Sequence, residues 1–218
     1  MLDAFLAVIK GLPMSLLLTV ASFVIGGIVA IPLALGLRSK IAPLRWVLRF
    51  LVDLIRGVPI IVWIFVAYYG ISEAMEGSGY EIENWVSAIL SLSIVSTAYL
   101  AEIYRGGILS VPVGQTEAAH ALGIKATPSF LKIVAPQAFK ISMPSIATYG
   151  IGLFKDTSIA SVIIVEDMVF QARSFAAQNP DIPGIYPYAI AAAIYVIVSV
   201  PVAMWSRRVD RKLQAGGH

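Results

Sequence analysis

One cluster of ionisable side chains lies inside a strongly apolar stretch of this 218-residue chain. It is the run Lys155, Asp156, Thr157 and Ser158, roughly 20 Å along a helix that begins near Ile141. Charged groups at such a depth usually face the interior of a helix bundle or a water-filled cavity. The run therefore predicts a site for a zwitterionic solute, with Asp156 meeting the ammonium group. Lys155, nearby hydroxyls or helix dipoles would meet the carboxylate.

A second interpretation gives the same residues a structural role, in which Lys155 and Asp156 neutralise partners at a subunit interface. Adjacent residues on a helix point about 100° apart, so the two charges cannot readily serve one ligand. Exposing both of them to one cavity requires a local break in the helix. Gly150 and Gly152 are the nearest candidates for that break.

The remaining composition excludes several kinds of chemistry. The chain has no cysteine, which removes thiol catalysis, disulfides and thiolate metal sites, and its two histidines, His120 and His218, form no metal-ligand cluster. No Gly-x-x-x-x-Gly-Lys-Ser/Thr phosphate loop is present. We therefore expect no catalytic residue, metal or cofactor on this chain, and any ATP-driven work must come from a partner.

The stretch from Glu117 to Pro136 is polar and punctuated, which indicates a docking element rather than a membrane crossing. Val113 to Leu122 favours a short helix that Gly123 can end in a left-handed conformation. Ala118 and Ala119 present little bulk on that helix and allow a partner to approach closely, while Glu117 supplies a charge.

A second short helix is expected directly after the glycine turn. Thr127 is a suitable N-cap and Pro128 suits the first helical position, so this helix runs towards Val134 before Pro136 opens the next segment. The two helices together predict a compact hairpin.

The spacing of this hairpin resembles the EAA signature of permease subunits of bacterial ABC importers. The matching positions are Glu117, Ala118, Ala119, Gly123, Ile133 and Pro136. Ala135 stands where the family usually has Leu. Four further segments resemble the polar amino-acid uptake branch, so that the likeness spans most of the chain: Ile55–Pro59, Ala101–Ile108, Val111–Gln115 and Lys155–Ser158.

The resemblance implies an all-α polytopic membrane protein of the type I ABC importer fold, with a cytoplasmic coupling hairpin. It implies that Glu117, Ala118, Ala119 and Gly123 sit in a groove on each of two ATP-binding cassette ATPases, which carry the ATP and Mg. A second permease subunit, either the same chain or a homologous one, and an extracytoplasmic solute-binding protein are the other implied protein partners. The implied solute is an amino acid. An amino-acid derivative stays an alternative, because Trp63 and Thr148 depart from the Gln and Asn that relatives often carry at these positions.

Composition places the chain in a membrane independently of that resemblance. Hydrophobic residues make up 58% and charged residues 13%, whereas soluble domains carry about a quarter charged residues. Pro13 to Leu37 has no charge and exceeds the roughly 30 Å hydrocarbon core. A secretory signal is the competing interpretation, but Asp3 and Lys10 precede this run and it is too long.

We expect one permease domain over residues 1–218, crossings at 13–37, 50–71, 85–104, 141–165 and 185–205, and a coupling region at 105–140.

The distribution of positive charge orients these crossings. Lys and Arg gather at residues 38–49, 105–140 and 207–212. In the connection at 73–83, the only charged residues are carboxylates, Glu73, Glu76, Glu81 and Glu83. Because cytoplasmic loops carry the excess of Lys and Arg, the N-terminus is expected outside and the C-terminus in the cytoplasm of a bacterial inner membrane. The net charge of +3 is then a matter of orientation and not of nucleic-acid binding.

Two of the expected crossings carry informative punctuation. Gly57-Val58-Pro59 predicts a break, and Asp53 and Arg56 before it favour mutual pairing and snorkelling. Trp63 and Thr148 join the candidate substrate pathway with the run that begins at Lys155. In the first crossing, small residues every four positions predict a close-packing stripe, Gly26, Ala30 and Ala34.

The function expected from these features is that of a permease subunit, which moves solute and performs no bond chemistry. An intramembrane scaffold that holds an enzyme or receptor, with residues 117–136 as a static docking site, is the alternative. A self-contained secondary transporter is less consistent with the short chain and the lack of an evident two-half repeat.

Overall fold

The computed structural model describes residues 1–75 and 83–215, and that part of the chain is helical with no β-strand. Predictions that involve Glu76, Glu81 and His218 lie outside the described residues. In chain order the elements are α1 Leu2–Ile9, α2 Leu12–Gly36, α3 Ala42–Gly57, α4 Ile60–Met75, α5 Asn84–Leu109, α6 Val113–Ala121, α7 Ala126–Ser129, a π-helical turn Phe130–Val134, α8 Ala135–Asp156, a 3-10 segment Thr157–Ile163, α9 Met168–Gln178 and α10 Ile185–Ala215.

Within the described ranges, three helical stretches are long and apolar enough to cross a membrane: Leu2–Gly36, Asn84–Leu109 and Ile185–Arg211. Helix α3 and the Ile60–Ile71 part of α4 make a fourth only as a pair bent by 101°. Helix α8 is long enough to cross a membrane but is more polar than these three stretches, since it contains Lys140 and several hydroxyl side chains. It also contains an internal Pro144. The points at which each helix enters and leaves the lipid stay predictions.

Two of the expected crossings are not single α-helices. Residues 50–71 divide because Pro59 has no amide hydrogen and Val58 before it is extended, with φ −95° and ψ 134°. Residues 141–165 divide at the end of α8, where the Thr157 hydroxyl donates to the Phe154 carbonyl at 2.7 Å. The chain then tightens into the 3-10 segment and ends it at Ile164, whose φ of 64° is left-handed.

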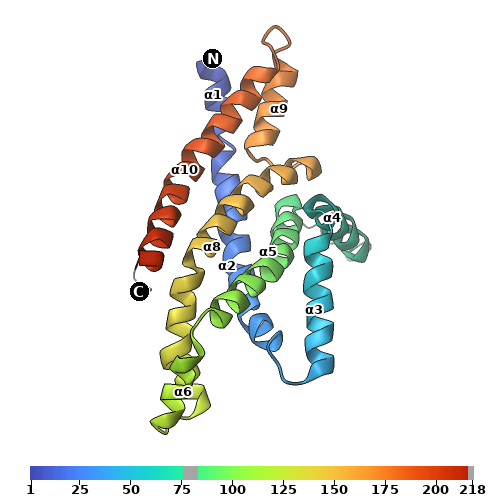
Figure 1. The fold of residues 1–218 in the computed structure, drawn as a ribbon. Helices are drawn as coiled ribbons and strands as arrows, with labels where there is room; N and C mark the ends of the chain where they lie inside the picture. The colour runs from blue at the N-terminus through green and yellow to red at the C-terminus, as the bar shows by residue number, and fades with distance from the viewer. Residues whose placement is uncertain (76–82, 216–218) are drawn as a thin grey trace.

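Helix α5 is the central element, and it packs against α2, α3, α4 and α8 (Figure 1). The predicted stripe of Gly26, Ala30 and Ala34 is confirmed, because all three residues are buried on α2. Gly26 lies against Ser96 of α5, and the Ser22 hydroxyl donates to the Ile89 carbonyl at 3.3 Å. Such small residues let helix backbones approach closely in lipid, where apolar burial between helices gains little.

Helices α1, α9 and the start of α10 gather at one end of the molecule, and α6 lies at the other (Figure 1). Helix α9 was not expected from the sequence. Its N-cap is Asp167, which is fully buried and accepts a hydrogen bond from the Phe170 amide at 2.8 Å. Burial raises the pKa of Asp167 to about 6, although backbone amides favour its charged form. The second carboxylate oxygen of Asp167 and the Tyr195 hydroxyl are both buried and have no hydrogen-bond partner among the described residues.

We predict that Gly26→Ala destabilises the protein, because a Cβ there would overlap with the Cβ of Ser96 and lie 3.0 Å from the Thr97 amide nitrogen. Overpacking of this kind costs about 1–3 kcal/mol, measured as a lower thermal unfolding midpoint in detergent micelles. Gly152→Ala is the matched control, since a Cβ at that helical glycine meets open space. Equal unfolding midpoints for the two variants would contradict the close α2–α5 contact.

Candidate functional site

The turn after α6 has the conformation expected from the sequence. Gly123 has a φ of 73°, and its amide donates to the His120 carbonyl at 2.9 Å. The Ile124 amide donates to the Ala119 carbonyl at 3.0 Å. These two bonds make a Schellman motif that satisfies the last carbonyls of α6 and reverses the chain. The predicted left-handed glycine is confirmed.

The second half of the hairpin differs from the prediction. The helix begins at Ala126 after an extended Lys125, and no side chain caps it, so Thr127 is not the N-cap. Pro128 falls in the first turn, where amide groups need no intrahelical acceptor. Helix α7, the π-helical turn and α8 follow without a gap. The boundary expected near Pro136 is therefore a change of helix type, since α8 begins at Ala135 with Pro136 in its first turn. The Ala135 amide donates to the Phe130 carbonyl across the π-helical turn, and Pro136 has no amide to extend it.

The outer surface of the hairpin is open to a partner. Glu117, Ala118 and Gly123 are exposed, and Leu122 is 79% exposed although it is a large apolar residue. These four residues are called the docking face below. Ala119 is only 2% exposed and packs inward, so it supports this face without forming part of its surface.

The hairpin is fixed to α5 and α8 by an apolar cluster of Val111, Val134 and Ala138. The Gln137 amide adds a link from α8 to α6, since it donates to the Gln115 side-chain carbonyl at 3.3 Å. Pro136 precedes Gln137 and is exposed on the same helix. A displacement of α6 therefore has to move the ends of α5 and α8 with it.

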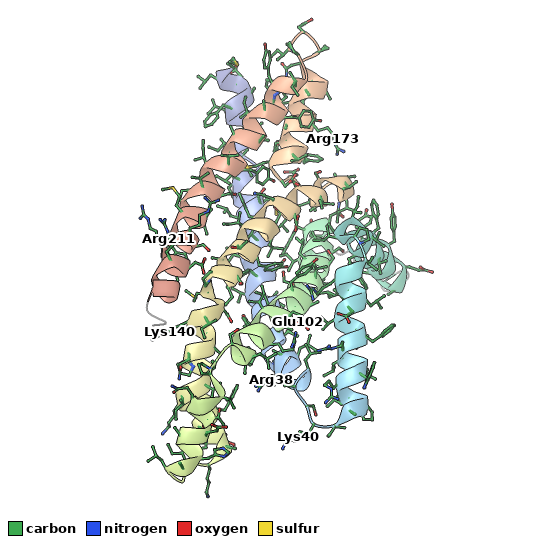
Figure 2. All side chains as sticks on the ribbon, viewed as in Figure 1. Arg38, Lys40, Glu102, Lys140, Arg173 and Arg211 are labelled. Atoms are coloured by element: carbon green, nitrogen blue, oxygen red, sulfur yellow. The ribbon has the colours of Figure 1, made fainter. Side chains whose placement is uncertain are left out.

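Helices α5 and α8 also meet closely beyond the hairpin. A Cβ at Gly107 would overlap with the Ser142 hydroxyl and lie 2.8 Å from the Ala138 carbonyl oxygen. On α5, Arg105 and Glu102 form a partly buried ion pair at 2.7 Å. Figure 2 shows Glu102 where α5 passes α3.

The run that begins at Lys155 sits where α8 gives way to the 3-10 segment. Lys155 is exposed, Asp156 and Ser158 are half-buried, and Thr157 is fully buried with its hydroxyl bound to the Phe154 carbonyl. The local break follows Asp156 directly. It does not occur at Gly150 or Gly152, because α8 continues through both.

Trp63 lies beside the other break. Its indole N–H donates to the Ile55 carbonyl at 3.1 Å. In an unbroken helix the residue four positions after Ile55 would donate to this carbonyl, but that residue is Pro59. Trp63 thus satisfies the acceptor that the proline leaves open. Thr148 is exposed, and its hydroxyl donates to the Pro144 carbonyl of its own helix at 2.9 Å.

A column of aromatic rings joins four helices, and the sequence did not reveal it. The Arg56 guanidinium lies 5.0 Å above the Tyr99 ring, which stacks on Tyr149 at 5.4 Å. Tyr149 stacks in turn on Phe23, and its hydroxyl donates to the Ser96 hydroxyl at 2.9 Å. No Asp53–Arg56 ion pair forms among the described residues, and the exposed Arg56 makes this cation–π contact instead.

Charged residues are distributed unevenly along the molecule. Figure 2 shows Arg38 and Lys40 toward the end that carries α6, and Arg173 toward the opposite end, where its guanidinium lies 5.4 Å above the Phe170 ring. In the described ranges, no three His, Asp or Glu side chains gather into a group able to hold a metal ion.

Comparison with known proteins gives the context for these features. Residues 22–215 match the family described as the inner membrane component of binding-protein-dependent transport systems. The L-cystine transport system permease protein of Bacillus subtilis is 36% identical, over 90% of this chain and 82% of that protein. The arginine transport system permease protein of Bacillus subtilis is 32% identical, over 95% and 93%. The octopine transport system permease protein of Rhizobium radiobacter is 33% identical, over 97% and 91%.

Solved structures agree with the same assignment. A crystal structure of an amino acid ABC transporter with histidines contains a chain that is 31% identical, with a TM-score of 0.86 over 97% of this chain and 96% of that chain. The inward-facing MetNI methionine ABC transporter shares the fold, with 18% identity and a TM-score of 0.71 over 97% of both chains.

We predict that Trp63→Phe loosens the α3–α4 junction, because the Ile55 carbonyl then loses its indole donor. We expect the free energy of unfolding to fall by about 1 kcal/mol. We also expect a broader distance distribution between spin labels on exposed Leu51 and Tyr69, measured by pulsed electron paramagnetic resonance. Trp46→Phe is the control, since Trp46 is 71% exposed on α3. An unchanged distribution in Trp63→Phe would show that this bond does not hold the junction.

Proposed function

Because the chain belongs to the family of inner membrane components of binding-protein-dependent transport systems, we propose that it translocates a polar amino acid or amino-acid derivative delivered by a solute-binding protein. It is a membrane-spanning permease subunit of an ATP-driven importer and has the type I importer fold. The solute class follows from relatives whose names specify L-cystine, arginine and octopine.

The observation that carries this function is the docking face on an anchored hairpin. Exposed Glu117 and Leu122 offer a charge and an apolar contact to a partner, and the Val111 cluster joins the hairpin to two long helices. Two ATP-binding cassette ATPases, which hold the ATP and Mg, occupy these faces in the assembled importer. A second permease subunit, the same chain or a homologous one, supplies the other hairpin, and this chain itself hydrolyses nothing.

The orientation proposed from the sequence places the hairpin in the cytoplasm. Arg38 and Lys40 lie toward the same end of the molecule as α6 (Figure 2), as expected if that end faces the cytoplasm. The N-terminus is then outside and the C-terminus inside the bacterial inner membrane.

The proposed cycle follows from how the hairpin is joined to the bundle. ATP binding draws the two hairpins together, and each hairpin pulls the ends of α5 and α8 because the Val111 cluster and the Gly107–Ser142 contact allow little slip. A site between the permease chains then opens towards the solute-binding protein. Hydrolysis releases the hairpins and returns the pathway to the cytoplasmic side.

The proposed solute contacts lie where α8 ends. Asp156 meets the ammonium group of the solute, while Lys155 and Ser158 meet its carboxylate, because the change from α-helix to 3-10 segment directs neighbouring side chains differently from a regular helix. Thr157 holds this turn from inside. Trp63 and Thr148 complete the candidate pathway, with Trp63 fixing the α3–α4 break that borders it.

Reversing the charge on the docking face tests the coupling role. We expect Glu117→Arg, and in a separate variant Gly123→Asp, to lower solute-stimulated ATP turnover at least about tenfold. Like charge or added bulk at a docked surface costs several kcal/mol of binding free energy. The measurement uses the permease with its ATPases and binding protein in vesicles.

Glu73→Arg is the matched control for that test, because Glu73 is also an exposed carboxylate but lies on α4. It should leave ATP turnover unchanged. Full coupling in both docking-face variants would show that the partner binds elsewhere.

A separate substitution tests the solute site. Asp156→Asn keeps the size of the side chain but removes its charge, and we expect the KM for uptake to rise roughly tenfold or more, as for the loss of a charged hydrogen bond. Asp53→Asn, an exposed carboxylate on α3, serves as the control. Competition across a panel of amino acids first identifies the transported solute, and the KM for its uptake is then measured for each variant. An unaltered KM in Asp156→Asn would remove this residue from the pathway.

A further inference from the structure

Helices α2, α8 and α10 border an open groove of about 460 Å³, and none of the residues proposed above for the solute pathway lines it. Its walls are almost entirely apolar. Val20 and Val24 of α2 and Val202 and Trp205 of α10 line it, and all four are between 42% and 59% exposed. Two hydroxyl side chains line it: the Thr19 hydroxyl is bound to the Ser15 carbonyl at 2.7 Å, and the buried Ser199 hydroxyl has no hydrogen-bond partner in the described part of the chain. Apart from that one hydroxyl, the groove offers an apolar occupant an apolar surface.

The length of the groove matches one leaflet of a bilayer. Along α8 it extends from Met143 to Phe154, which is about 16 Å at the helical rise. Half of the roughly 30 Å hydrocarbon core is about 15 Å. Helices α2 and α10 both belong to stretches that are long and apolar enough to cross a membrane, which makes lipid the expected surroundings of the groove.

Positive side chains continue the groove past one end. The Ser206 hydroxyl donates to the Pro144 carbonyl at 3.1 Å and sets the register between α10 and α8. Lys140 lies three residues before Met143, and Arg208 lies three residues after Trp205, so each extends the groove-lining stripe of its helix by one turn. Both side chains are exposed.

A third cation adds to this cluster. Arg211 follows Arg208 by three residues, and Figure 2 shows Arg211 on α10 and Lys140 on α8 along the same flank of the molecule. Asp210 is the one carboxylate of this stretch of α10, and Arg207, Arg208 and Arg211 outnumber it. The end of the groove is thus positively charged.

We infer that the groove binds an anionic phospholipid, with one acyl chain against α2, α8 and α10 and the phosphate group between Lys140 and Arg208. An acyl chain alone would fit a groove without charges. The cations at its end select an anionic headgroup, because basic side chains near a membrane surface attract such lipids. Trp205 lies at the boundary between the two parts, where tryptophan favours the membrane interface.

Quenching of Trp205 by brominated lipids tests the inference on the full chain. The chain and its Trp205→Phe variant are placed in phosphatidylcholine vesicles with brominated phosphatidylglycerol or brominated phosphatidylcholine, and the difference between the two proteins gives the Trp205 signal. We expect phosphatidylglycerol to bind about fivefold more tightly for each cation engaged. Lys140→Gln with Arg208→Gln should bring the two lipids to equal affinity.

Two controls separate this site from general attraction to the membrane. Arg38→Gln with Lys40→Gln removes two exposed cations elsewhere and should leave the preference intact. Val20→Phe should reduce quenching by both lipids because it fills the groove, whereas Ile28→Phe, 63% exposed on the same helix outside the groove, should not.

Three results would overturn the inference. Equal quenching by both lipids in the unsubstituted chain would remove the headgroup selectivity. A preference that survives the Lys140 and Arg208 substitutions would move the anion elsewhere. Quenching by neither lipid would mean that protein, such as a second copy of the chain, fills the groove.

Discussion

The close approach of α5 to both α2 and α8 is the constraint on which the rest of the molecule depends. In lipid, apolar burial gives little force to hold helices together, so contact at the backbone has to replace it. Gly26 provides that contact on one side of α5 and Gly107 on the other, and neither position has room for a Cβ. Helix α5 therefore cannot slide past its neighbours, and the hairpin that connects it to α8 is joined to a single packed unit. In the proposed cycle, force applied at α6 passes to α5 and α8 through that packed unit.

Breaks in the membrane helices obey a second constraint, since a backbone carbonyl released from its helix needs another donor where water is scarce. Pro59 releases the Ile55 carbonyl, and the Trp63 indole takes it up. At the end of α8 the Thr157 hydroxyl binds the Phe154 carbonyl in a similar way. Both breaks are thus internally satisfied. The Asp156 side chain makes no capping hydrogen bond at the second break, which is consistent with the solute contact proposed for it.

Local features of the fold were predictable from sequence and distant ones were not. The turn at Gly123 follows from the residues around it, and the stripe on α2 follows from its four-residue period. Thr127 is not the N-cap because the helix already begins at Ala126, after an extended Lys125. Gly150 and Gly152 do not break α8, which continues through both of them. The column from Arg56 through Tyr99 to Tyr149 and Phe23 needs four helices in register, which spacing along one chain does not encode.

Exposed apolar side chains have different meanings on the hairpin and along the groove, because the proposed surroundings of the two surfaces differ. Leu122 is exposed on the same hairpin as Glu117, and covering it with a protein partner removes its apolar surface from water. Val20 and Val202 are exposed on membrane-capable helices, where acyl chains cover them without cost. In the functions proposed here, the hairpin is covered by a protein partner and the groove by a lipid, whose headgroup is selected by the charges at the end of the groove.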